Sequence, residues 1–321
     1  MAAITATAYG HGMVPVARHL TDVDAFAVAR VPEAAELREH DIGVPIVLLE
    51  GVIDERELQA AVAMGFEPVV HCREQLELLE ATHTGAITVW LKFDTGMNRL
   101  GFPPEDAAAL IDRVRACPVV NEFRLMTHLS SADEVEASTT IRQLAQFRPI
   151  ISDFDGAVRI GNTPGVLGWP AVADAKQEFG FHGDNWVRPG IDLFGITPFA
   201  EKTGADLGLK PVMQFEARLI AKKPLASGAK VVYKVEYISD RDTQIGIVSA
   251  GYGDGYTRHF RSGTPVLING RRVSLIGNVS MDMIAVDLGL DAKDAVGDIA
   301  TLWGDGLPVE EVAPFADAIP Y

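Results

Sequence analysis

Apolar and polar positions alternate in two different ways along the chain, and the change falls near residue 203. Up to residue 200, short apolar runs rich in Val, Ile and Leu are separated by stretches with helical spacing. One such stretch begins at Pro104, a residue type favoured in the first turn of a helix, and places apolar residues at positions 107, 110, 111 and 114. The predicted strands cover residues 3–8, 25–30, 45–50, 68–71, 86–94, 123–130, 158–162 and 186–195.

Eight strand–helix repeats with apolar strands favour a parallel α/β barrel, because strands buried on both faces read as continuous apolar runs. A doubly wound open sheet remains an alternative, since a strand count does not show that the sheet closes. We therefore predict an eight-stranded (β/α)8 barrel domain over residues 1–203.

After residue 203, strand-like runs follow one another without long helices between them, at residues 212–221, 244–250, 264–268, 273–276, 283–287 and 298–303. The dipeptide Asn269-Gly270 lies between two of these runs and is typical of a two-residue hairpin turn. This pattern predicts a mainly antiparallel β domain over residues 204–321. Both ends of the chain look cut, within the first predicted strand and at Tyr321, so we expect an incomplete β domain with exposed apolar surface and unpaired sheet edges.

Composition limits the classes of partner. The chain has 321 residues, 48% of them hydrophobic, which is enough for a large barrel or two domains. Its 28 Lys and Arg against 44 Asp and Glu give a net charge of −16, which disfavours nucleic acid and anionic membranes as partners. No apolar run approaches the ~20 residues of a membrane span, and the N-terminus lacks the pattern of a signal peptide. Cys72 and Cys117 form neither a disulfide framework nor a metal-ligand spacing, so we expect a soluble cytoplasmic protein without a metal.

Polar and basic residues gather at the predicted carboxyl ends of the strands, where a parallel barrel carries its chemistry. Taken singly, each has a structural interpretation, such as a turn, a hydrogen-bonded histidine or an arginine paired with a carboxylate. Their convergence on one mouth favours a binding site, and the glycine-flanked turn at residues 9–12 is typical of a phosphate or cofactor site. The residues concerned come from five strands and are Tyr9, Lys92, His128, Asn162, Thr163 and Arg188.

Five segments, in this order, resemble the alanine racemase family: residues 8–12 (AYGHG), 91–101 (LKFDTGMNRLG), 186–191 (WVRPGI), 251–256 (GYGDGY) and 280–283 (SMDM). The resemblance has compatible spacing and runs nearly from end to end. It implies an eight-stranded α/β barrel followed by a β domain. It also implies interconversion of L- and D-alanine with pyridoxal 5′-phosphate (PLP), which supplies D-alanine for peptidoglycan. For the last two segments, an interpretation as plain turns remains the alternative.

The resemblance assigns roles to the residues that carry the chemistry. It makes Tyr233 the base on the L-side of the substrate, offered into the site of a neighbouring subunit, so that a homodimer is required. It makes His128 the hydrogen-bonding partner of Tyr233, because a tyrosine with an ordinary pKa of about 10 is a poor base at neutral pH. It places Arg188 at the pyridine nitrogen of the cofactor, where a guanidinium that keeps its protons leaves that nitrogen unprotonated.

By the same resemblance, the cofactor phosphate is held by Tyr9, Thr163, Gly190, Ile191 and Tyr321, with Asn162 beside them. Hydroxyls and backbone N–H groups are the donors that a dianion needs, and glycine at position 190 lets the backbone approach closely. Arg99 and the backbone of Met281, the latter from the partner chain, are implied to contact the substrate carboxylate. Lys92 matches a lysine that some members of the family carbamylate.

The main departure from the family is Thr5, which stands where the resemblance places the lysine that holds the cofactor covalently. No lysine precedes Lys92, so no neighbour can replace it. Threonine can neither bind the aldehyde covalently nor take the D-side proton, and loss of a positioned base costs ~10²–10⁴ in rate. We therefore expect PLP to be bound non-covalently at most and racemisation to be severely impaired. Lys234, directly after Tyr233, is a smaller departure at a position where glycine is more usual.

Two other functions remain open at this point. One is a non-catalytic PLP-binding protein of the same fold, and the other is an enzyme of this fold that racemises another amino acid or performs an aldol-type cleavage. The joint presence of Tyr233, His128, Arg188 and Arg99 favours the impaired alanine racemase.

Overall fold

The chain folds into two compact units. The computed structural model describes residues 1–134, 137–231 and 237–320. The first unit comprises residues 1–193 and 198–200, and the second comprises residues 194–197 and the chain from residue 201 onward. In the part of the chain that is described, no helix is both long enough and apolar enough to cross a membrane.

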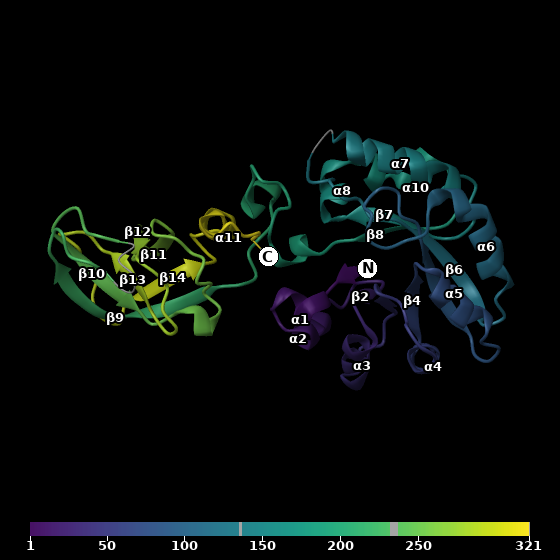
Figure 1. Ribbon diagram of the computed structural model, residues 1–321, viewed down its shortest axis with the longest axis horizontal. Helices are drawn as coiled ribbons and strands as arrows, with labels where there is room; N and C mark the ends of the chain where they lie inside the picture. The colour runs from purple at the N-terminus through teal and green to yellow at the C-terminus, as the bar shows by residue number, and fades with distance from the viewer. Residues whose placement is uncertain (135–136, 232–236, 321) are drawn as a thin grey trace. The chain divides into compact units, whose positions relative to one another are not determined.

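The first unit is built on eight parallel strands that pair in the order of the sequence (Figure 1). Backbone hydrogen bonds from Met1 N to Val187 O (2.8 Å) and from Ala3 N to Pro189 O (2.9 Å) bring the last strand back to the first. The sheet is therefore a nearly closed barrel, which confirms the predicted α/β barrel and excludes the doubly wound sheet. The strands are β1 (Ala2–Ala3), β2 (Phe26–Val28), β3 (Ile46–Leu48), β4 (Phe66–Val70), β5 (Ile87–Lys92), β6 (Val120–Met126), β7 (Val158–Asn162) and β8 (Asn185–Arg188).

Helices connect successive strands and lie on the outside of the sheet (Figure 1). The helix predicted after Pro104 is confirmed, because a 3₁₀ turn, η1 (Pro104–Asp106), leads into α6 (Ala107–Ala116), which buries Ala107, Leu110 and Val114. The remaining helices are α1 (Thr5–Tyr9), α2 (Met13–His19), α3 (Val31–Glu39), α4 (Glu55–Met64), α5 (Arg73–Glu80), α7 (Ser138–Ile151), α8 (Thr163–Gly168), α9 (Pro170–Ala173), α10 (Ala175–Phe179) and η2 (Ile191–Phe194).

Local sequence explains where α4 begins and ends. Asp54 precedes the helix, and its Oδ1 accepts the N–H of Glu57 at 2.8 Å, one of the donors that a helix leaves unpaired at its start. Gly65 follows the helix with φ of 66°, the left-handed conformation that ends many helices.

The first predicted strand, residues 3–8, is wrong beyond Ala3. Residues 5–9 form α1 instead, and residues 6–9 all have φ between 50° and 57°, in the left-handed region. An L-residue in this region costs ~1–2 kcal/mol, so tertiary contacts must hold the turn. One of them is a hydrogen bond from Ala6 N to Glu33 Oε1 (3.1 Å). The runs predicted at residues 123–130 and 186–195 also extend too far, since β6 and β8 end at Met126 and Arg188.

The interior of the first barrel contains a charged and aromatic group of side chains, hereafter the floor cluster, made of Glu67, Trp90, Arg124 and Trp186. Glu67 Oε2 pairs with Arg124 Nη1 at 3.1 Å and accepts the N–H of Trp90 Nε1 at 2.8 Å. The Arg124 guanidinium lies 5.3 Å from the ring centroid of Trp90 and 5.1 Å from that of Trp186. Burial raises the pKa of Glu67, and the charge of Arg124 opposes that rise. The cluster fills the barrel below the strand ends, because each tryptophan stands two residues before the last residue of its strand.

The second unit is a closed antiparallel barrel in the order β10-β13-β12-β11-β14-β9. Asn269 and Gly270, with φ of 49° and 73°, form the two-residue turn between β11 and β12, which confirms the predicted hairpin. The expected unpaired sheet edges are wrong for these six strands, because each pairs with two neighbours. The strands, each overlapping one predicted run, are β9 (Phe215–Leu225), β10 (Thr243–Val248), β11 (Pro265–Ile268), β12 (Arg271–Ile276), β13 (Ile284–Asp287) and β14 (Ile299–Trp303).

The core of the second unit is apolar and lies inside this barrel. It includes Leu219, Val248, Leu275 and Leu302, together with the buried ring of Tyr256. Short helical turns flank the strands at η3 (Gly204–Leu207), η5 (Tyr252–Asp254), α11 (Val309–Val312) and η6 (Ala313–Ala316).

Candidate active site

A cavity of about 300 Å³ lies at the carboxyl ends of the strands in the first unit. Its lining includes Thr5, Lys92, Arg99, His128 and Arg188, all of them predicted site residues. It also includes residues that sequence reasoning missed, namely Ala29, Leu49, Glu50, Leu100 and Met126. The signal for three of these was available, because positions 29, 49 and 50 directly follow β2 and β3, and barrels build their sites from such positions.

Arg188 and His128 are hydrogen-bonded to each other, with Nη2 of Arg188 2.7 Å from Nδ1 of His128. A guanidinium only donates, so Nδ1 of His128 accepts and the imidazole proton resides on Nε2. Burial, followed by the positive charges of Arg188 and Arg159, holds the pKa of His128 well below its usual range. The imidazole is therefore neutral at physiological pH. The resemblance paired His128 with Tyr233, which lies outside the described residues.

Arg159 of β7 is a buried cation that sequence reasoning missed. Its guanidinium donates from Nη1 to Thr127 O and from Nη2 to Gly161 O (3.2 Å). The side chain is fully buried, and burial lowers the pKa of Arg159 well below its usual range. The one sequence signal for it is a basic residue between the apolar residues of a buried strand.

Lys92, the last residue of β5, is on the same level of the sheet as Arg159, because Met126 of the intervening strand pairs with both residues. Only 7% of Lys92 is exposed. Burial, followed by the charges of Arg159, Arg99 and Arg188, lowers the pKa of Lys92 to about 7, while Asp94 opposes the fall. A large share of this amine is therefore neutral and nucleophilic at physiological pH.

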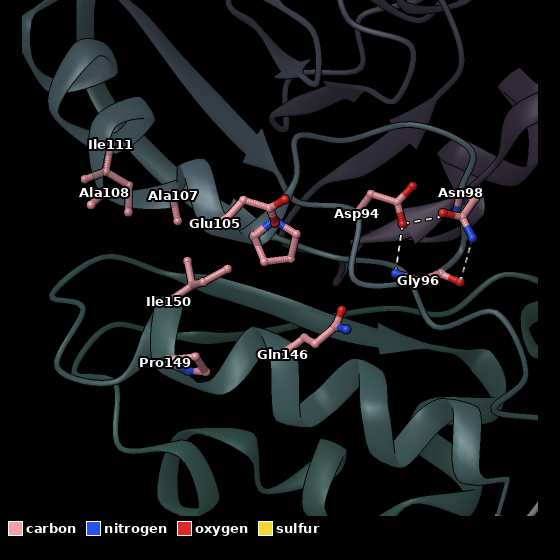
Figure 2. Close-up of a pocket in the computed structure, with 11 residues that line it drawn as sticks. Asp94, Gly96, Asn98, Glu105, Ala107, Ala108, Ile111, Gln146, Pro149 and Ile150 are labelled. Atoms are coloured by element: carbon pink, nitrogen blue, oxygen red, sulfur yellow. Dashed lines mark hydrogen bonds between the residues drawn. The ribbon is translucent and has the colours of Figure 1, made fainter.

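Arg99 is carried by a loop, residues 94–99, that Asp94 organises (Figure 2). Asp94 Oδ1 accepts the N–H groups of Gly96 (2.9 Å), Met97 (2.9 Å) and Asn98 (3.0 Å). Its Oδ2 accepts the N–H of Arg99 at 3.1 Å. Burial alone would raise the pKa of Asp94, but these donors outweigh it and lower the pKa. The same loop borders a groove of about 830 Å³. Figure 2 shows the residues of η1, α6 and α7 that line it.

Thr163, Gly190 and Asp192 form a compact hydrogen-bonded group, hereafter the Asp192 cradle. Thr163 Oγ1 donates to Asp192 Oδ1 at 2.7 Å, and the N–H of Gly190 is shared between Thr163 Oγ1 and Asp192 Oδ1, at 2.9 Å to each. A Cβ atom on Gly190 would lie 2.7 Å from Tyr9 Oη, so the close approach of these two residues requires glycine. The structure thus brings together Tyr9, Thr163 and Gly190 and adds Asp192, which sequence reasoning missed.

The other predicted site residues are placed as follows. Ile191 is buried directly after Gly190, and the Asn162 side chain accepts the N–H of Gly165 (3.2 Å) at the start of α8 and donates to Leu129 O (3.1 Å). Met281 belongs to the second unit, where its side chain is exposed and its carbonyl accepts the N–H of Gly253 (2.8 Å). Tyr233 and Tyr321 lie outside the described residues.

The polar groups of the site fit a phosphate-bearing, negatively charged cofactor. Nε of Arg188 is buried and has no hydrogen-bond partner among the described residues, so a donor remains for an acceptor from outside the chain. Arg99 and Arg159 add positive charge around the cavity, which a bound anion would compensate. Among the residues that the structure describes, no group of three or more His, Cys, Asp or Glu side chains gathers to hold a metal ion.

Fold and cavity together define a two-domain α/β-barrel protein with a positively charged site at its strand ends. The sequence model of the alanine racemase N-terminal domain matches residues 1–198, and that of the alanine racemase C-terminal domain matches residues 212–321. The chain belongs to the alanine racemase family.

Similar proteins cover nearly the whole chain. An alanine racemase of Aeromonas hydrophila is 46% identical over 323 residues, which span 100% of this chain and 88% of that protein. An alanine racemase of Vibrio cholerae is 44% identical over 100% of this chain and 87% of that protein. The crystal structure of the biosynthetic alanine racemase from Pseudomonas aeruginosa is 41% identical, with a TM-score of 0.92 over 100% of this chain and 87% of its own. The alanine racemase of Bartonella henselae with covalently bound pyridoxal phosphate is 26% identical, with a TM-score of 0.83 over 99% of this chain and 87% of its own.

Proposed function

We propose that this chain binds PLP at the mouth of its first barrel and interconverts L- and D-alanine at a severely reduced rate. The observation that carries the proposal is the single cavity that collects Thr5, Lys92, Arg99, His128 and Arg188. Family membership supports the reaction, and the Bartonella henselae relative with bound pyridoxal phosphate supports the cofactor.

Different residues around the cavity would bind different parts of the cofactor. Arg188 would hold the ring nitrogen through its guanidinium, whose Nε has no partner among the described residues. Tyr9, Thr163, Gly190, the backbone of Ile191 and Tyr321 would hold the phosphate, while Asn162 fixes the start of α8 beside them. When bound, PLP supplies an electron sink that stabilises negative charge on the α-carbon of an amino acid.

Binding and proton transfer fall to this chain's own side chains. Arg99 binds the substrate carboxylate, and Asp94 holds the loop that positions it. Tyr233 exchanges the proton on the L-face. His128, whose Nδ1 is bound to Arg188, keeps Nε2–H as a donor, and a donor to the phenolate oxygen of Tyr233 would lower the pKa of that phenol.

Thr5 accounts for the reduced rate. It lines the cavity but provides a hydroxyl where the family has an amine. A hydroxyl is too weak a base to take the D-face proton and cannot anchor the cofactor through nitrogen, so PLP is held non-covalently at most.

Lys92 is a proposed carbamylation site. Its neutral amine forms a bond from Nζ to the carbon of carbon dioxide, one C=O π bond of carbon dioxide becomes a C–O⁻, and one proton leaves Nζ for the solvent, so that a neutral amine becomes a buried anion. The product would lie near Arg159 and Arg99, whose charges now lower the pKa of Lys92, and would orient Arg99. Intact-mass measurement with and without bicarbonate tests this, and an unchanged mass after bicarbonate treatment would contradict it.

Assembly and location follow from the same proposal. Tyr233 and the backbone of Met281 act in the site of a partner subunit, so the active species is a homodimer with two composite sites. Cys72 and Cys117 are both free thiols, which fits a reducing cytoplasm in which D-alanine is made for peptidoglycan. Sedimentation at several concentrations tests the dimer, and a monomer at all of them would contradict it.

Replacing Thr5 with lysine tests the function. With PLP present, Thr5→Lys should raise the rate of D-alanine formation from L-alanine by at least ~10², because a positioned base is restored. Thr5→Met is the matched control, because methionine is nearly as long as lysine but has no amine. It should leave the rate at its starting level. If Thr5→Lys binds PLP covalently but changes the chirality of no amino acid, the chain is a non-catalytic PLP-binding protein instead.

A further inference from the structure

The Asp192 cradle contains an anion supplied by the chain itself. Asp192 Oδ1 accepts both the hydroxyl proton of Thr163 (2.7 Å) and the N–H of Gly190 (2.9 Å). Thr163 and Gly190 stand 27 residues apart in the sequence and are brought together by the adjacent ends of β7 and β8. A carboxylate oxygen therefore occupies the point on which the two donors converge.

These are the donors that a phosphate group would need. A hydroxyl carries one proton, so Thr163 cannot donate to Asp192 and to a phosphate at the same time. The single hydrogen of the Gly190 N–H is already shared between two oxygens. Phosphate and carboxylate carry like charges, so one disfavours the other at close range.

We propose that Asp192 is an internal competitor for the cofactor phosphate, which occupies Thr163 and Gly190 and thereby sets the affinity of the site for phosphorylated ligands. The inference rests on the proposed function, since it assumes that a phosphorylated cofactor binds here. The competition matters more in this chain than in one with a lysine at position 5. Without a covalent link, non-covalent contacts such as those of Thr163 and Gly190 are all that hold the cofactor. Rapid exchange of the cofactor is the expected result.

Equilibrium binding of three probes tests the competition. PLP, inorganic phosphate and unphosphorylated pyridoxal are titrated into the wild-type chain and into Asp192→Asn, with binding followed by tryptophan fluorescence or calorimetry. Asparagine keeps the size of the side chain but removes its charge, and its amide can rotate to donate. We expect the affinity for PLP and for inorganic phosphate to rise at least about tenfold, and the affinity for pyridoxal to stay the same.

Two further variants separate competition from a structural role. Asp192→Ala also removes the carboxylate and should raise the affinity for PLP. If Asp192 were instead needed to orient Thr163, Asp192→Ala would lower the affinity for PLP. In a Thr163→Val background the gain from Asp192→Asn should shrink, because one of the contested donors is gone. Asp112→Asn is the charge-matched control, since Asp112 is exposed on α6, and it should change no affinity.

The outcomes distinguish this inference from the function on which it rests. Equal PLP affinity in wild type and Asp192→Asn, or weaker binding in both Asp192 variants, would overturn the competition and leave PLP binding intact. Binding of PLP by Asp192→Asn but not by wild type would support the competition in its strongest form. If no variant binds PLP or phosphate, both the cofactor site and the competition are wrong.

Discussion

Replacing Lys92 with methionine should change how the stability of the first unit depends on pH. Lys92 is 7% exposed and lies among arginines, and burial followed by the charge of Arg159 lowers the pKa of Lys92 from 10.5 to about 7. Methionine has a similar volume and cannot be protonated. The variant therefore removes one buried titration and leaves the packing of β5 in place.

The size and sign of the effect follow from the proton balance. Each tenfold change in proton affinity is worth ~1.4 kcal/mol, so the fall in the pKa of Lys92 corresponds to ~5 kcal/mol. Below a pH of about 7, Lys92 is protonated in both the folded and the unfolded chain, and the folded chain bears the full cost of the buried charge. Between pH 7 and 10.5 only the unfolded chain keeps the proton, so this cost falls as pH rises and is absent above 10.5. Relative to Lys92→Met, the wild-type free energy of unfolding should therefore increase by up to ~5 kcal/mol over this range.

The assay is urea unfolding followed by tryptophan fluorescence, in buffers free of carbon dioxide so that the amine stays unmodified. Three of the four tryptophans, Trp90, Trp169 and Trp186, belong to the first unit, so the signal reports mainly on that unit. Lys176→Met is the control, because Lys176 is exposed on α10, and its difference from wild type should not vary with pH. The reasoning is refuted if Lys92→Met differs from wild type by the same free energy at about pH 6.5 and about pH 9.5.

Three further predictions concern the turns and the interior of the first unit. Gly190→Ala should weaken PLP binding at least ~tenfold, because its Cβ would lie 2.7 Å from Tyr9 Oη. The same change made in a Tyr9→Phe background should cost less affinity, measured against Tyr9→Phe alone, and an equal loss in both backgrounds would contradict the clash. Asp94→Asn should speed amide hydrogen exchange at residues 96–99 at least ~tenfold, because a neutral oxygen binds N–H groups more weakly than a carboxylate. Unchanged exchange would contradict the role of the Asp94 carboxylate in holding the loop. Glu67→Gln should lower the free energy of unfolding of the first unit by ~1.5–3 kcal/mol, because Arg124 loses one of its two carboxylate partners and keeps only Glu122, whose Oε1 lies 2.6 Å from Nε of Arg124. The same loss in an Arg124→Met background would refute that cause.

Much of the fold could be predicted because its signals are local. The hairpin at Asn269-Gly270 needs two adjacent residues that tolerate positive φ, and the helix after Pro104 needs one favourable start and an apolar face. The left-handed turn at residues 6–9 could not be predicted, because none of these residues is glycine and a distant carboxylate, that of Glu33, helps to hold it. Closure of the six-stranded barrel was equally hidden, since it depends on the pairing of β9 with β10 and β14.

The candidate site was predictable to the extent that strand ends determine it. Lys92, His128 and Arg188 meet because neighbouring parallel strands end at the same mouth, so the order of the strands already places them together. Asp192 could not be predicted, because it acts on Thr163, a residue 29 positions earlier. The hydrogen-bond partners of Arg159 could not be predicted either, since they are backbone carbonyls and every residue has one.

The floor cluster closes the first barrel beneath its cavity. Glu67, Trp90 and Arg124 obstruct the barrel beneath Arg188, so a molecule lodged against that guanidinium must leave by the route along which it came. For ligands bound as proposed, the one seated deepest arrives first and departs last. The vitamin-derived cofactor must then bind before the amino acid. An excess of the amino acid would slow the dissociation of the cofactor.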